Sequence, residues 1–201
     1  MRITTLKFSI LALVVMVALA MVPVASANSL NLTANNLGLS GTIGTVNFVQ
    51  NGANVDVTIS MSAGYVLLIN GGDIGINTTG GLVLTGSSLS NFSINGLSTS
   101  LKPNGTIGGF NFSYIFKTGV TGGQQFPTTL SFSILNATVS QLTGFGVHFC
   151  VAPGNVCSGN TGFVSTGGGN TPPPVPEPGT LGLLGTGLVG IAGVVRRRLL
   201  S

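Results

Sequence analysis

The middle of the chain is predicted to be all-β, an antiparallel β-sandwich of the jelly-roll or immunoglobulin-like type. Residues 55–61 and 110–116 alternate apolar and polar side chains, the pattern of a strand with one buried face. This part of the sequence contains no helical stripe longer than two turns. Further strand candidates follow one another closely, which favours two packed antiparallel sheets over a helical or α/β fold.

These other strand candidates share short apolar or alternating runs, and they lie at 45–49, 65–69, 82–84, 90–94, 97–101, 129–135 and 145–151. The alternation over 110–116 places its four aromatic residues on one face of the strand. Asn51-Gly52 predicts a type I′ hairpin turn, because both central positions of that turn need a positive φ. Asn70-Gly71 and Asn104-Gly105 are weaker signals of the same kind.

The N-terminal segment, residues 1–27, is predicted to be a secretory signal peptide. It opens with two basic residues, continues through an apolar core over 8–22 and ends in Ala25-Ser26-Ala27, the small-x-small pattern that signal peptidase requires. We expect cleavage after Ala27. An uncleaved membrane anchor is the alternative, but Pro23 breaks the helix just before the cleavage site.

At the other end, residues 175–201 combine a short motif, an apolar segment and a basic cluster. The uncharged run 179–195 would span about 25 Å as a helix, slightly less than the bilayer core of roughly 30 Å. Its six glycines weaken it further. Arg196, Arg197 and Arg198 follow at once and stay cytoplasmic by the positive-inside rule, which places the upstream chain outside. The segment is therefore predicted to be a single, marginal transmembrane helix with an exported domain before it.

The motif Pro176-Glu177-Pro178, followed by the glycine-rich span and the arginines, resembles the PEP-CTERM sorting signal of exported bacterial proteins. The resemblance implies that exosortase recognises the motif and cuts near it. It also implies transient anchoring in the inner membrane, then a location at the cell surface or outside the cell, where exopolysaccharide is made. The alternative is a C-terminal tail anchor with a proline-rich stalk.

Between the two targeting segments, we predict an ectodomain over 28–155 and a Gly/Ser/Pro-rich linker over 156–174. Once the two targeting segments are removed, the positive charges of Lys102 and Lys117 are balanced by the negative charges of Asp56 and Asp73. The basic charge of the whole chain therefore belongs to its targeting segments. It does not indicate a nucleic-acid partner, which needs clustered Lys and Arg on the folded surface.

Cys150 and Cys157, with His148 close by, suggest two alternatives. Imidazole and thiolates suit zinc, but only three ligands are present and the protein is predicted to be exported to an oxidising compartment. A Cys150–Cys157 disulfide is therefore expected, with no metal and no cofactor. His148 is expected on the opposite face of its strand from Val147 and Phe149, as a surface or loop-packing residue.

The sequence does not support catalytic residues. A glycosidase needs two convergent carboxylates, whereas Asp56 lies on an alternating strand and Asp73 in a glycine turn. A Ser-His-Asp set could use His148, but no Gly-x-Ser-x-Gly elbow marks a nucleophile. Six Asn-x-Ser/Thr sequons are attributed mainly to composition: Asn31, Asn77, Asn91, Asn104, Asn111 and Asn136.

These observations rank three hypotheses for the function. The first is a structural or adhesive protein associated with exopolysaccharide, processed by signal peptidase and exosortase. The second is a polysaccharide-binding module, although the chain has no Trp and Tyr65 and Tyr114 lie in core-like apolar runs. A secreted hydrolase is third.

Overall fold

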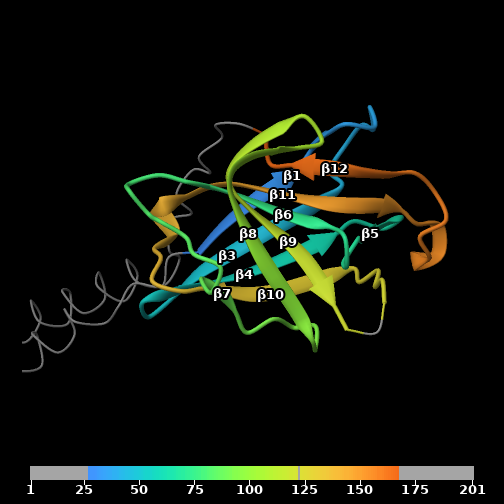
Figure 1. Ribbon diagram of the computed structural model, residues 1–201. Helices are drawn as coiled ribbons and strands as arrows, with labels where there is room; N and C mark the ends of the chain where they lie inside the picture. Colours follow the sequence, from blue (N-terminus) through green and yellow to red (C-terminus); the bar gives the residue numbers. More distant parts are fainter. Residues whose placement is uncertain (1–26, 122, 168–201) are drawn as a thin grey trace, which may run out of the picture. The chain divides into compact units, whose positions relative to one another are not determined.

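A computed structural model describes residues 27–121 and 123–167 of the chain. These residues form two antiparallel β-sheets packed face to face, which confirms the all-β sandwich (Figure 1). Residues 1–26 of the predicted signal peptide and the whole sorting segment lie outside the described residues. Within the described part, no helix is long and apolar enough to cross a membrane.

The first sheet, sheet A, contains five strands in the order β1-β3-β4-β10-β7. Their bounds are Ala27–Leu32 for β1, Gly44–Asn51 for β3, Asn54–Met61 for β4, Thr129–Ile134 for β10 and Leu89–Ser90 for β7. The buried side chains of β3 and β4 alternate strictly with polar or more exposed ones. Sheet A therefore follows the pattern read from the sequence.

The second sheet, sheet B, has the order β2-β12-β11-β6-β9-β8, and β5 pairs with the end of β11. The bounds are Ala34–Asn35 for β2, Tyr65–Leu67 for β5, Asp73–Thr78 for β6, Leu97–Ile107 for β8, Phe110–Val120 for β9, Leu142–Val151 for β11 and Thr161–Ser165 for β12. Two short 3₁₀ turns, η1 at Val139–Gln141 and η2 at Pro153–Asn155, precede and follow β11.

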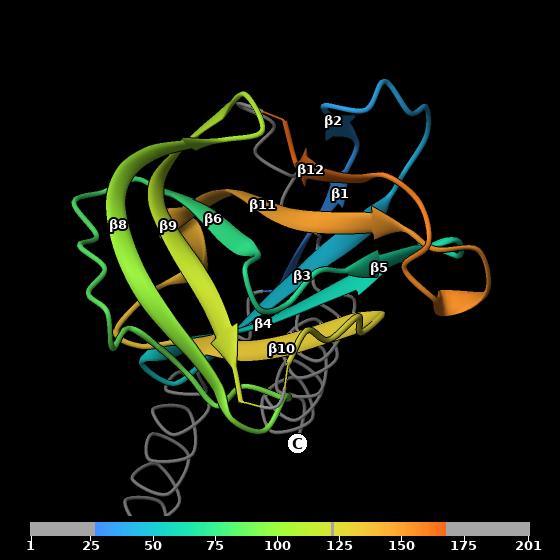
Figure 2. The ribbon, with the colours of Figure 1, turned by 45° about the vertical axis from the view of Figure 1, so that its right-hand side comes forward.

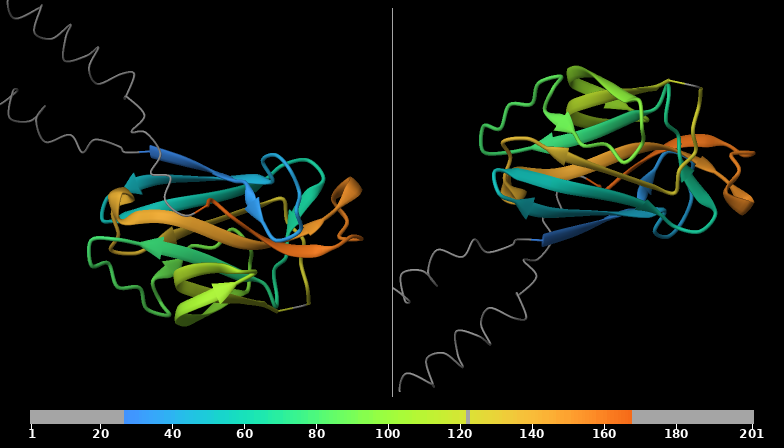
Figure 3. Two further views of the ribbon diagram at one scale, coloured as in Figure 1. Left: turned by 90° about the horizontal axis from the view of Figure 1, so that it is seen from above. Right: turned by 90° about the horizontal axis from the view of Figure 1, so that it is seen from below.

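The main core fills the space between the two sheets (Figure 3). At its centre the rings of Phe48 on β3 and Phe145 on β11 lie 5.3 Å apart, and both side chains are fully buried. The run from β1 into β2 also joins the layers, because β1 pairs with β3 in sheet A and β2 pairs with β12 in sheet B. One domain with a shared core results.

A second, smaller core lies on the other face of sheet B and gathers residues of the β8–β9 hairpin and of β12. Figure 2 shows the long, curved course of this hairpin. Gly75 and Gly146 are cross-strand partners on β6 and β11. A Cβ atom at either position would run into the ring of Phe112, so the ring lies directly on this glycine pair. Ile107, Ile115, Phe110 and Phe163 complete the cluster.

This second core corrects the prediction that the aromatic residues of 110–116 share one face. Tyr114 and Phe116 pack with the main core, whereas Phe110 and Phe112 belong to the outer cluster. The change of face coincides with Asn104, whose φ of 46° interrupts β8 between the Pro103–Tyr114 and Gly105–Phe112 pairs. Asn104-Gly105 is thus an irregularity within a strand, and the hairpin turns at Gly108-Gly109.

The turn predicted at Asn51-Gly52 is also shifted. Asn51 pairs with Asn54, so Gly52 and Ala53 are the two central residues. Only Gly52 has a positive φ, 59°, which is the pattern of a type II′ turn and not the predicted type I′. Either turn keeps the strands in a tight hairpin, so the strand prediction holds although the turn type was wrong.

Several predicted boundaries change. Residues 82–84 form no strand, and only Leu89–Ser90 pairs where a strand was expected over 90–94. The predicted linker contains β12, which pairs with β11 over five residues and buries Val164 completely. The folded domain therefore continues past Asn155 to at least Ser165, because backbone pairing orders a stretch whose composition resembles a linker.

Candidate functional site

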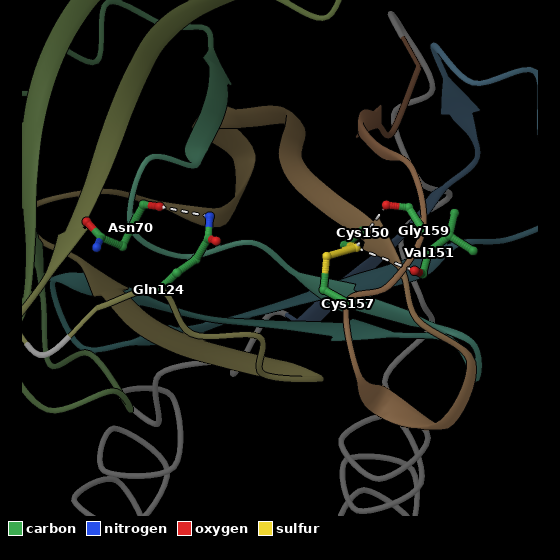
Figure 4. Close-up of a disulfide and its surroundings, with 6 residues drawn as sticks. All are labelled: Asn70, Gln124, Cys150, Val151, Cys157 and Gly159. Atoms are coloured by element: carbon green, nitrogen blue, oxygen red, sulfur yellow. Dashed lines mark hydrogen bonds between the residues drawn. A yellow bond between two sulfur atoms is a disulfide. The ribbon is translucent and has the colours of Figure 1, made fainter.

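Cys150 and Cys157 form the predicted disulfide, with their Cα atoms 5.6 Å apart, inside the range that disulfides require (Figure 4). Both sulfur atoms are used in this bond, so neither is a thiolate ligand for zinc. Cys150 is fully buried on the outer face of sheet B, beside Val66 and Ala152. The disulfide reading of the cysteine pair is therefore confirmed.

The disulfide closes the loop that carries η2, between the end of β11 and the approach to β12. The Sγ atom of Cys150 lies 3.4 Å from the carbonyl oxygen of Val151 and 3.9 Å from that of Gly159 (Figure 4). The amide of Gly159 donates to the same Val151 carbonyl. Nearby, the side chain of Gln124 donates to the carbonyl of Asn70, which joins two further loops. The loop end of sheet B is thus held by covalent and backbone links.

His148 lies on the outer face of β11, as predicted, and stacks on Phe163 of β12. The ring centroids are 4.2 Å apart at an interplanar angle of 19°. Its Nδ1 atom is buried without a hydrogen-bond partner among the described residues. Burial lowers the pKa of His148, and this effect is opposed by the Asp73 carboxylate and by the backbone of Gly71.

Asp73 is the first residue of β6 and not a turn residue as predicted; the turn is at Asn70 and Gly71, which both have positive φ. Burial raises the pKa of Asp73, while Lys117, His148 and Lys102 act to lower it. The fold thus brings Asp73 and His148 close together. No hydrogen bond joins His148 to a hydroxyl within 27–121 and 123–167.

The other aspartate, Asp56, has a structural role on sheet A. It accepts hydrogen bonds from the hydroxyl of Ser133 and the side-chain amide of Asn51, both at 2.7 Å. Over the described residues, no three His, Cys, Asp or Glu side chains are grouped to hold a metal ion. The two tyrosines pack against the main core, in agreement with the sequence interpretation.

An open groove of about 410 Å³ lies where the hairpin β8–β9 passes the end of β6. Asn77 and residues 104–106 and 111–113 line it, and every lining side chain is uncharged. Sequence reasoning missed this groove. A signal was present, because Asn77, Asn104 and Asn111 each begin a sequon, but the positive φ of Asn104 and the bend that gathers the three could not be read from spacing.

Hydrogen bonds hold two of the groove's three asparagine side chains in place. The backbone amide of Ser113 donates to Oδ1 of Asn77 at 2.9 Å, and Nδ2 of Asn77 donates to the Asn111 carbonyl at 3.3 Å. The hydroxyl of Thr106 donates to Oδ1 of Asn111 at 2.7 Å. The Nδ2 group of Asn111 and the whole Asn104 amide have no partner in the described part of the chain, and both side chains are exposed. The groove can therefore offer donors and acceptors to a ligand.

Comparison with known proteins places a sorting signal at the C-terminus. Residues 174–198 match the PEP-CTERM protein-sorting motif, a range that includes Pro176-Glu177-Pro178 and the three arginines. This match supports an exported exosortase substrate, located at the cell surface or outside the cell. No curated protein and no solved structure matches the chain. The motif lies outside the described residues, so its site is defined by sequence alone.

Proposed function

We propose that this protein is cleaved by signal peptidase after Ala27, anchored transiently by its C-terminal span and then cut by exosortase near Pro176-Glu177-Pro178. The product is a non-catalytic structural or adhesive protein of the cell surface or extracellular matrix, associated with exopolysaccharide. The observation that carries the proposal is the match of residues 174–198 to the PEP-CTERM protein-sorting motif.

The properties of the domain support an extracellular structural role. Its two aspartates and two lysines cancel, so the domain has no net charge to attract a strongly acidic or basic partner. A disulfide persists in an oxidising compartment and stabilises a domain that has left the cell. The carboxylates that a hydrolase would use are engaged elsewhere: Asp56 in hydrogen bonds on sheet A, and Asp73 beside two lysines on sheet B.

A polysaccharide-binding module is the second candidate, favoured by one observation. The groove at the β8–β9 hairpin is lined by amides and hydroxyls and by no charged side chain. Such a surface suits an uncharged, hydroxyl-rich ligand. The two candidates are compatible, because a matrix protein can act by binding the polymer that surrounds it.

The test replaces Pro176-Glu177-Pro178 by three alanines in a host that encodes an exosortase. We expect the variant to accumulate as a longer, membrane-associated form, while the unsubstituted protein is recovered from the envelope or medium without its last 25 or so residues. A matched control replaces Pro172 and Pro173 by alanine, which disturbs the same spacer but leaves the matched residues 174–198 unchanged. C-terminal peptide mapping of the surface or secreted protein shows whether the last residues have been removed. Peptides ending at Ser201 in the surface protein would indicate a tail anchor and contradict exosortase processing.

A further inference from the structure

The groove beside the β8–β9 hairpin is built on the outer core of sheet B. Phe112 forms its floor and is only 4% exposed, because its ring rests on the glycine pair Gly75–Gly146. This contact holds residues 111–113 against the end of β6, and the bend at Asn104 turns residues 104–106 toward the same space. The groove is therefore a consequence of packing.

Hydrogen bonds order two of the three asparagines of the groove, Asn77 and Asn111, before any ligand arrives. Asn77 is fixed by bonds to both the backbone and the hydroxyl of Ser113. The hydroxyl of Thr106 donates to Oδ1 of Asn111, which leaves the Nδ2 group of this exposed residue available to a ligand. Ordering side chains on binding costs free energy, and side chains that are already held avoid much of that cost.

The chemistry of the lining selects the class of ligand. Asparagine amides and threonine or serine hydroxyls both donate and accept hydrogen bonds, as sugar hydroxyls do. None of the four charged residues of the domain lines the groove, so an anionic polymer gains no ion pair there. The volume falls within the range of ligand sites, roughly 300–1,000 Å³, and the groove is open to solvent.

We propose that this groove binds a segment of a neutral polysaccharide through Asn104, Asn111 and Thr106, over the floor formed by Phe112. The inference rests on the proposed function, since it names the ligand class that an exported matrix protein would meet. Binding depends on hydrogen bonds at an exposed site, so removal of one amide is expected to weaken affinity by about two- to tenfold. The two amide substitutions together should abolish measurable retention.

Affinity chromatography of the trimmed, secreted protein tests this site, on columns that carry immobilised dextran, galactomannan or alginate, and the retardation of its elution is measured. Dextran and galactomannan are neutral, whereas alginate is anionic. We expect retardation by at least one neutral polymer and none by alginate. The variants Asn104→Gly and Asn111→Ala should reduce this retardation. Glycine is chosen at 104 because it keeps the positive φ without strain.

Asn136→Gly is the matched control. Asn136 is also exposed, begins a sequon and has a positive φ of 52°, but it follows β10 outside the groove. Retardation lost in the groove variants and kept in the control supports the site. Equal retardation of all variants, preference for alginate, or a glycan on Asn104 or Asn111 in the intact mass would each overturn it.

A failure of the groove is distinguishable from a failure of the proposed function. If no neutral polymer retards the protein, the groove inference is wrong, whereas trimming at the PEP motif is scored separately by peptide mapping. If untrimmed protein reaches the surface, the sorting proposal is wrong, and the retardation experiment on that material still reports on the groove. Loss of the disulfide in any variant, detected by mass, identifies misfolding, and Thr106→Val then serves as the second groove variant.

Discussion

Sheets A and B use their two faces differently. In sheet A, Val46 and Phe48 of β3 point into the core and Thr45 and Asn47 point outward, so one face is apolar and the other polar. In sheet B the inner face packs against the same core, but the outer face also buries side chains under the β8–β9 hairpin. The comparison shows that the alternation rule holds for a sheet with one solvated face and weakens where both faces are covered.

The largest expected effect is at the centre of the sandwich. Phe48→Ala removes a fully buried ring that contacts Phe145 across the two sheets, and it should lower the free energy of unfolding by about 3–5 kcal/mol. Urea denaturation of the disulfide-intact secreted protein measures it.

Phe112→Ala makes the matched change on the outer face of sheet B. We expect it to lower the free energy of unfolding by about 3 kcal/mol, the lower end of the range for a buried Phe→Ala change, because the hairpin can settle toward the glycine pair. Hydrogen exchange should increase in β8 and β9 more than in β3 and β4. A Phe112→Ala protein within 0.5 kcal/mol of the unsubstituted one would contradict a packed outer core.

The next effect concerns the disulfide at the loop end of sheet B. Replacing both Cys150 and Cys157 by serine should lower the free energy of unfolding by about 2–3 kcal/mol, because the disulfide restricts the unfolded chain over a short loop. The intact mass of the unsubstituted protein should be two hydrogens below the reduced value. A free thiol titrating in unreduced secreted protein would refute the pairing, and reduction of the unsubstituted protein is the control for the serine substitutions themselves.

Much of this fold could be predicted from residue order. The alternating strands of sheet A, the disulfide and the outward position of His148 depend on local spacing, which sequence reasoning handles directly. Strands β1, β6 and β12 were missed, although Leu30 and Leu32 in β1 and Ile74 and Ile76 in β6 alternate with polar or small residues. β6 contains Gly75 and Asn77, and β12 lies in a stretch rich in Gly, Ser and Thr. Both β6 and β12 become ordered by pairing with β11. For β6, this partner lies far away in the sequence.

The groove could not be predicted for a related reason. It depends on a glycine pair brought together by strands β6 and β11, and on a change of face within β9. A glycine in a strand signals close approach of another group, but the sequence does not say which group approaches. The sorting motif is the opposite case, because an enzyme reads it as a linear segment, and the sequence alone was sufficient to find it.

A smaller effect tests the glycine pair directly. Gly146→Ala places a methyl group where the ring of Phe112 lies. This overpacking should lower the free energy of unfolding by about 1–3 kcal/mol. Gly86→Ala is the control, since its added methyl group meets no atom within 4 Å, and we expect a change within about 0.5 kcal/mol. Combining Gly146→Ala with Phe112→Leu should cost less than the sum of the two, because the smaller side chain relieves the clash. Strict additivity would show that the two residues do not touch.

The smallest effect is a pH dependence confined to sheet B. Burial lowers the pKa of His148, so below its usual 6.5 the unfolded chain binds the proton first, and stability falls as the pH decreases through that window. Burial raises the pKa of Asp73, so the folded protein takes up that proton first, and stability is regained as the pH decreases toward 3.8. Lys117, His148 and Lys102 act to lower the pKa of Asp73 and so oppose the effect of its burial. Thermal unfolding between pH 7 and 4 should therefore show a shallow minimum, in which His148→Gln removes the higher-pH limb and Asp73→Asn the lower one. A flat profile, or an unchanged one in both variants, would mean that neither group is shifted by the outer face of sheet B.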